Sequence, residues 1–142
     1  MILLLDRITN APSVDFNMSS YFEATKVDGL VLEFGVARGD SIRKIANGFP
    51  NKNVYGFDSF EGLPEDWRQS IQKGAFACDV PTDLPENVTL VKGWFEATLA
   101  SFLEEHEGPV AFIHVDCDIY SATKTIFDNL QDRIVDLSLI HI

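Results

Sequence analysis

Short runs of apolar residues alternate along this chain with segments in which apolar residues return every three or four positions. Such runs are typical of strands buried on both faces, and the periodic segments are typical of helices that cover them. The expected strands are 29–34, 53–57, 88–92, 110–115 and 137–142. The expected helices are 40–48, 94–105 and 121–130, with a short helix at 19–26 and an excursion at 60–83 that has room for one more.

Strands that alternate with helices at this spacing favour right-handed βαβ crossovers and a parallel sheet. We therefore expect an α/β fold, a Rossmann-like parallel sheet with flanking helices, over residues 29–142. Residues 1–28 are expected to form an N-terminal lead-in. Because parallel sheets bind ligands beyond the carboxyl ends of their strands, the polar and glycine residues at those ends form the candidate site.

The first expected strand ends at Glu33 and runs into a turn with glycines at 35 and 39. Glycines allow a sharp turn close to a ligand, and the helix that follows offers free N–H groups. The GxxxG spacing differs from the GxGxxG of dinucleotide sites, and an acid beside the turn suits a cationic group. S-adenosylmethionine carries such groups, and its carboxylate can bind the helix start or Ser41. An ordinary strand-to-helix turn is the alternative. The predicted cofactor contacts here are Glu33, Gly35, Ala37, Gly39 and Ser41.

Two further strand ends carry residues suited to an adenosyl group. Asp58 ends the second strand, where an acid can accept hydrogen bonds from both ribose hydroxyls or, alternatively, cap a turn. Gly93 and Trp94 follow the third strand, and Trp94 suits the flank of an adenine base as well as it suits the core.

The fourth strand ends in the segment His114-Val-Asp116-Cys-Asp118. Side chains alternate along a strand, so these three polar residues share a direction if the strand stays extended. Carboxylates suit Mg²⁺ or Ca²⁺, and a metal ion can lower the pKa of a substrate hydroxyl. We predict Asp116 and Asp118 as metal ligands and Asp116 and His114 as catalytic candidates, with the general base unassigned. The alternatives are a core histidine for His114 and a helix cap for Asp118.

Composition narrows the class of protein. The chain has 142 residues, is 46% hydrophobic and contains no apolar run near the ~20 residues that a membrane-spanning helix needs. A net charge of -11 disfavours nucleic-acid binding, because such a chain repels phosphates. Two cysteines make neither a disulfide framework nor a zinc motif. We expect a cytoplasmic protein that binds small molecules and neither membranes nor nucleic acids.

Four segments then carry a resemblance to a known family. They are VLEFGVARGDSIRKIA, VYGFDSFEGLPEDW, VTLVKGWFEATL and AFIHVDCDIYSATKTIFDNL. Together, over residues 29–135, they closely resemble the macrocin O-methyltransferase-like family of class I S-adenosylmethionine-dependent methyltransferases. A more distant likeness, the ExGxxxGxS pattern, is to catechol O-methyltransferase. The resemblance implies Mg²⁺-dependent methyl transfer from S-adenosylmethionine to a hydroxyl of a sugar or other small molecule.

The resemblance also assigns roles by position. It implies that Glu33, Gly35 and Ser41 hold the methionine moiety of the cofactor, and that Asp58 holds the ribose with Ser59 and Phe60 close by. It further implies that Gly93 and Trp94 border the adenine and that Asp116 binds a metal ion.

The last residues depart from the family pattern. Members continue after a segment like DRIV with a glycine-containing turn and a strand ending in acids that complete the metal site, whereas this chain reads DLSLIHI. We therefore expect a fold truncated at its C-terminal end. The main hypothesis is an O-methyltransferase. The alternative is a catalytically inactive S-adenosylmethionine-binding domain that self-associates, as a homodimer, through an exposed sheet edge. A nucleotide-dependent oxidoreductase is disfavoured by the absence of GxGxxG.

Overall fold

The computed structural model describes residues 22–23 and 25–141. Of the helix expected at 19–26, residues 19–21 and 24 lie outside the described part of the chain, 22–23 are helical and 25–26 are not. The described elements, in chain order, are β1 (Leu30–Phe34), α3 (Asp40–Gly48), β2 (Val54–Asp58), β3 (Val88–Lys92), α4 (Phe95–Glu105), β4 (Val110–Val115), α5 (Tyr120–Leu130) and β5 (Ile134–His141). None of the helices among these residues is long and apolar enough to cross a membrane.

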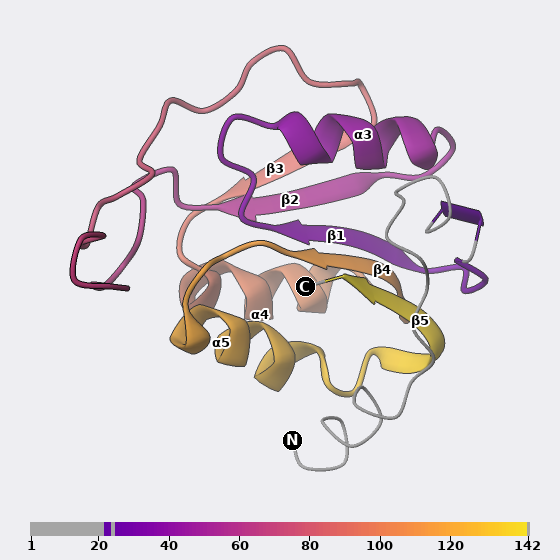
Figure 1. Cartoon of the computed structure of the whole chain (residues 1–142). Helices are drawn as coiled ribbons and strands as arrows, with labels where there is room; N and C mark the ends of the chain where they lie inside the picture. The colour runs from indigo at the N-terminus through magenta and orange to yellow at the C-terminus, as the bar shows by residue number, and fades with distance from the viewer. Residues whose placement is uncertain (1–21, 24, 142) are drawn as a thin grey trace.

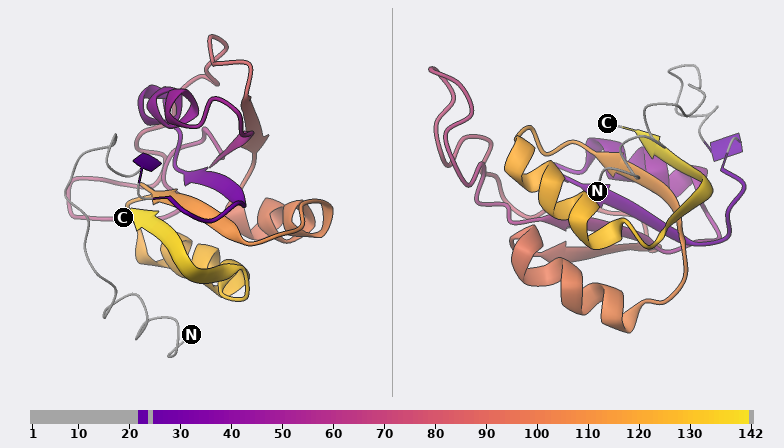
Figure 2. Two further views of the ribbon diagram at one scale, coloured as in Figure 1. Left: turned by 90° about the vertical axis from the view of Figure 1, so that its right-hand side faces the viewer. Right: turned by 90° about the horizontal axis from the view of Figure 1, so that it is seen from below.

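The strands form one parallel sheet with the order β3-β2-β1-β4-β5. Helix α3 covers one face of the sheet, and α4 and α5 cover the other (Figure 1; Figure 2, left). The expected α/β fold, a Rossmann-like parallel sheet with flanking helices, is confirmed. The chain moves outward from β1 to β3 and then returns to place β4 on the opposite side of β1, so strand order reverses between β1 and β4.

Alternation along the strands divides the core into two layers. Leu32 and Phe34 of β1 point toward α4 and α5, whereas Val31 packs on the α3 side with Ile42 and Ile45. A Cβ at position 56 would lie 2.4 Å from Ile42 Cδ1, so glycine there lets α3 approach β2 closely. The apolar runs and the helical periodicity thus predict which faces are buried.

Three segments differ from the sequence prediction. The excursion at 60–83 contains no helix. Instead it folds back on itself, with the Leu63 N–H bonded to Ala75 O and the Gly74 N–H bonded to Leu63 O at 2.9 and 2.8 Å. Strand β5 begins at Ile134, three residues earlier than expected, and its register against β4 shifts along the way. Helix α4 begins at Phe95, because the Trp94 backbone is extended and serves as its N-cap.

Candidate functional site

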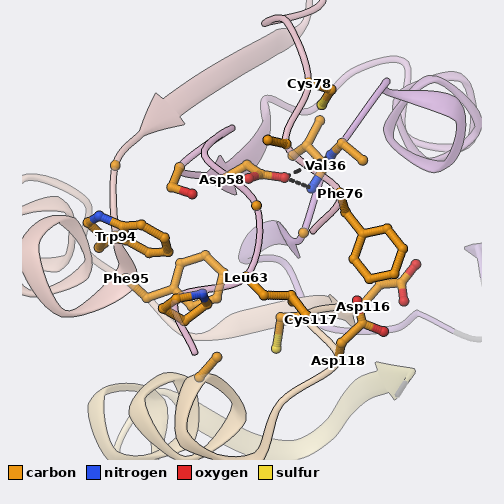
Figure 3. A pocket seen from close by; sticks show the side chains of 18 of the residues that line it. Val36, Asp58, Leu63, Phe76, Cys78, Trp94, Phe95, Asp116, Cys117 and Asp118 are labelled. Carbon is orange, nitrogen blue, oxygen red and sulfur yellow. Dashed lines mark hydrogen bonds between the residues drawn. The ribbon is translucent and has the colours of Figure 1, made fainter. Parts of the chain in front are cut away.

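A pocket of about 820 Å³ lies at the carboxyl ends of the central strands, where strand order reverses. This is the position at which open parallel sheets bind ligands, and the volume suits a small molecule. The loops after β1, β2, β3 and β4 all contribute to its wall (Figure 3). Of the predicted site residues, those that line it are Gly35, Ala37, Ser41, Asp58, Ser59, Gly93, Trp94, Asp116 and Asp118. Those outside the lining are Glu33, Gly39, Phe60 and His114.

Asp58 fixes the shape of the turn after β1. Its Oδ2 accepts hydrogen bonds from the backbone N–H groups of Val36 and Ala37, both at 2.8 Å. Its Oδ1 accepts a third from the Phe60 N–H, also at 2.8 Å. A carboxylate offers about four acceptor positions, so this arrangement leaves one for a ligand rather than the pair expected for two ribose hydroxyls. The carboxylate therefore organises the pocket wall as well as facing the cavity.

Gly35 has a structural role in addition to the cofactor contact predicted for it. Its φ of +91° requires glycine, and a Cβ at this position would lie 2.0 Å from the Asp116 carbonyl oxygen. The close approach is therefore to the backbone that follows β4, not only to a ligand. It brings the first and fourth strand ends together at one side of the pocket.

Glu33 and His114 form a buried pair on the two adjacent central strands of the sheet. They are register neighbours on β1 and β4, and His114 Nδ1 lies 2.8 Å from Glu33 Oε1. The Glu33 side chain is completely buried, and burial raises the pKa of its carboxyl, an effect that the neighbouring His114 and Ser41 side chains oppose. His114 also stacks on His141, with ring centroids 4.9 Å apart. Among the described residues, no hydrogen bond reaches Glu33 Oε2.

The position of this pair bears on the roles predicted for Glu33 and His114, which stay predictions. Strand β4 ends at Val115, and Asp118 has a φ of +63°, so the alternation that would align His114 with the two aspartates does not continue. His114 is the buried histidine of the alternative interpretation, and its place outside the pocket gives no support to a catalytic role. Glu33 is buried outside the pocket lining, but its carboxyl lies close enough to Ser41 and Asp116 of the pocket wall for both to affect its pKa.

We expect Glu33→Gln and Glu33→Ala to differ clearly in stability. Glutamine keeps an acceptor for His114 and removes a costly buried charge, so its free energy of unfolding should stay within about 1 kcal/mol of the original chain. Alanine leaves a cavity and an unpaired His114 nitrogen, at a cost of about 3 kcal/mol. Urea denaturation at neutral pH measures both. Equal losses for the two variants would show instead that the ionised carboxylate is required.

Asp116 and Asp118 are exposed on the pocket wall after β4 (Figure 3). Partial burial and the negative charge of Asp116 raise the pKa of Asp118, and Arg68 opposes the shift. We predict that Asp116→Asn lowers the pKa of Asp118, because the repulsion disappears. A ¹³C NMR pH titration of the side-chain carboxyl measures this, with Glu105→Gln at the exposed end of α4 as control. An unchanged pKa of Asp118 in Asp116→Asn would contradict the proximity of the two groups.

Among the described residues, no group of three or more histidine, cysteine, aspartate or glutamate side chains is arranged to hold a metal ion. The predicted metal ligands Asp116 and Asp118 provide two carboxylates. The described residues therefore do not form a complete metal site of the kind expected.

Sequence reasoning missed the part of the pocket that comes from the excursion and from α5. These residues are Gly62, Leu63, Pro64, Glu65, Phe76, Ala77, Cys78, Ser121, Ala122 and Thr125. The excursion begins two residues after Asp58, and this adjacency is the one signal in the sequence that could have indicated its place at the pocket. A hydrogen bond of 2.6 Å from Ser121 Oγ to Glu65 Oε1 joins the two segments.

The fold and the position of the pocket define a Rossmann-like α/β domain of the kind found in methyltransferases. Two solved structures share this fold. The O-methyltransferase NovP has a TM-score of 0.63 at 24% identity, covering 83% of this chain and 59% of that chain. The apo structure of CalS11, a TDP-rhamnose 3'-O-methyltransferase in calicheamicin biosynthesis, has a TM-score of 0.66 at 19% identity, covering 98% and 74%.

The sequence places the chain more narrowly. A family model described as "Methyltransferase domain" matches residues 32–142, and the chain belongs to this family. It is 31% identical over 137 residues to the 8-demethyl-8-(2,3-dimethoxy-alpha-L-rhamnosyl)-tetracenomycin-C 4'-O-methyltransferase of Streptomyces olivaceus. That match covers 78% of this chain and 51% of the relative, so the chain spans about half of the relative's length. The narrower assignment to the macrocin-like family stays a prediction.

Proposed function

We propose that this chain functions as an S-adenosylmethionine-dependent O-methyltransferase that acts on a hydroxyl group of a sugar or other small molecule. The observation that carries the proposal is the pocket at the strand-order reversal of a methyltransferase-family chain. The names of two similar proteins, the tetracenomycin-type enzyme and CalS11, refer to rhamnose-containing substrates, which supports a sugar as the acceptor.

The chemistry of the pocket lining fits the proposed cofactor. Carboxylates of Asp58, Asp116 and Asp118 give the pocket a negative character that suits a sulfonium and an ammonium group. Trp94 and Leu63 supply apolar surface for a purine ring. In the proposed arrangement, Asp58 binds one ribose hydroxyl, Gly93 and Trp94 border the adenine, and Ser41 lies toward the methionine end.

The chain's own residues would act mainly by alignment. Bound S-adenosylmethionine supplies an electrophilic methyl group. An acceptor hydroxyl oxygen would form a bond to the methyl carbon as the carbon–sulfur bond broke, S-adenosylhomocysteine would leave, and the hydroxyl proton would pass to a base. Holding the three atoms in line is a large part of such catalysis. With His114 outside the pocket, Asp116 is the residue of this chain that we assign to accept the proton.

Magnesium enters the proposal only through the resemblance. Asp116 and Asp118 are the residues that would contribute to a metal site, but the described residues supply no third ligand of the kind expected. The predicted homodimer also stays a prediction; β5, at one edge of the described sheet, is where a second copy would pair.

Transfer of an isotopic methyl group tests the proposal. The chain would be incubated with S-adenosylmethionine labelled in its methyl group, together with methyl α-L-rhamnopyranoside or catechol as acceptor. We expect label on an acceptor oxygen. If the chain binds the cofactor but transfers no label, the alternative of a catalytically inactive domain is favoured. If the chain neither binds the cofactor nor transfers label to an acceptor, the proposal is contradicted.

A further inference from the structure

An exposed aromatic side chain stands in the pocket wall. Phe76 is 57% exposed and lines the pocket, and its φ of +68° lies in the left-handed region that non-glycine residues rarely adopt. Both features cost free energy, because an apolar ring faces water and the backbone is strained. Strained residues that persist at a binding cleft commonly serve the function of that cleft. No part of the cofactor arrangement described above uses this ring.

The excursion that carries Phe76 is held over the pocket by specific contacts. The hydrogen bonds between Leu63 and its partners Gly74 and Ala75 close the base of the excursion. The bond from Ser121 Oγ to Glu65 Oε1 fastens the same segment to the start of α5. The ring is therefore positioned by the fold rather than left on a free loop.

The surroundings of Phe76 combine two kinds of chemistry. Figure 3 shows the ring on the same side of the pocket as Asp116 and Asp118, with Trp94 on the opposite side. An apolar ring beside two carboxylates matches a ligand with an apolar face and several hydroxyl groups at its edge. A sugar ring has both, since its C–H bonds form one face and its hydroxyls can donate to carboxylates. A flat, hydroxyl-poor acceptor would leave the carboxylates unpaired.

We propose that Phe76 determines acceptor specificity by packing on the C–H face of a sugar ring whose hydroxyls bind Asp116 and Asp118. This inference rests on the proposed function, because it assigns the acceptor half of the same pocket. It places the acceptor on the β4 side and leaves the adenosyl group on the β2 and β3 side.

Binding measurements on the full chain test the inference without requiring turnover. With the chain saturated by S-adenosylhomocysteine, NMR titration would give the Kd of methyl α-L-rhamnopyranoside, a sugar without an aromatic group. We expect Phe76→Ala to weaken this Kd by about fivefold to tenfold. Phe76→Trp, which keeps an aromatic ring at this position, should have a Kd within about twofold of the original chain's value. The matched control is Tyr120→Ala, since Tyr120 is 77% exposed but lies outside the pocket lining, and it should leave the Kd unchanged.

The outcomes separate this inference from the proposed function. Failure of the unmodified chain to bind S-adenosylhomocysteine would contradict the proposed function itself. Normal binding of S-adenosylhomocysteine with equal sugar affinity in the original chain and Phe76→Ala would overturn the inference alone. The inference would also be overturned if Phe76→Ala lost affinity for S-adenosylhomocysteine by the same factor as for the sugar, because the ring would then lie on the cofactor side of the pocket. Binding of catechol but not of the sugar would also overturn it.

Discussion

Gly35→Ala is expected to lower the free energy of unfolding by about 4 kcal/mol or more, enough to prevent stable folding of many domains of this size. Two effects add at this position. The φ of +91° is strained for any residue with a side chain, and the new Cβ would lie 2.0 Å from the Asp116 carbonyl oxygen. The obstacle is backbone in a central strand connection, so no side-chain rotation relieves it. Urea denaturation monitored by circular dichroism measures the loss.

Gly108→Ala is the matched control for this prediction. Gly108 also has a positive φ, +102°, but a Cβ there would meet nothing within 4 Å. Its replacement should cost about 1 kcal/mol, from backbone strain alone. The difference between the two variants isolates the close contact between the strand ends. Similar losses for both would mean that β1 and β4 do not approach as closely at the pocket as the structure has them.

Asp58→Ala is expected to raise the Kd for S-adenosylmethionine by at least about 100-fold, which corresponds to about 2.7 kcal/mol. The carboxylate holds the N–H groups of Val36, Ala37 and Phe60, and hydrogen bonds to charged groups contribute more than neutral ones. Their loss would free the turn after β1 at the same time as it removes the proposed ribose contact. Calorimetric titration with S-adenosylmethionine measures the change.

The control for this variant is Asp132→Asn, which alters an exposed acid outside the pocket lining. It should leave the Kd within about twofold of the original value. Asp58→Asn adds a second test. An amide NH₂ turned toward the backbone N–H groups would repel them, and an amide oxygen turned toward them would accept more weakly than a carboxylate. Unchanged affinity in both Asp58 variants would remove this residue from the cofactor site.

Much of the fold could be predicted from the sequence because its signals are local. The β1 and β4 segments are apolar except for Glu33 and His114, and both strands are buried on both faces. The residues that follow such strands fall at one edge of a parallel sheet whatever the details of packing. For this reason the sequence alone predicts that Asp58, Gly93 and Asp116 lie at the ligand-binding edge, and all three line the pocket.

The remainder depends on contacts between distant parts of the chain. The bond between Glu33 and His114 joins residues 81 positions apart, and it turns two predicted site residues into a buried pair. The bond between Glu65 and Ser121 spans 56 positions and holds the excursion over the pocket. The left-handed backbone of Phe76 carries no sequence signal, because glycine is the residue that marks such a conformation.

A titration of the ¹⁵N-labelled chain with S-adenosylmethionine, followed by amide NMR spectra, tests the central claim most directly. That claim is that the loops after β1, β2 and β3 together bind the adenosyl cofactor. We predict saturable shifts concentrated at the amides of Ala37, Ser59 and Trp94, and no comparable response to NAD. An unchanged spectrum at saturating concentrations, or shifts centred at the opposite, amino-terminal edge of the sheet, would contradict the account.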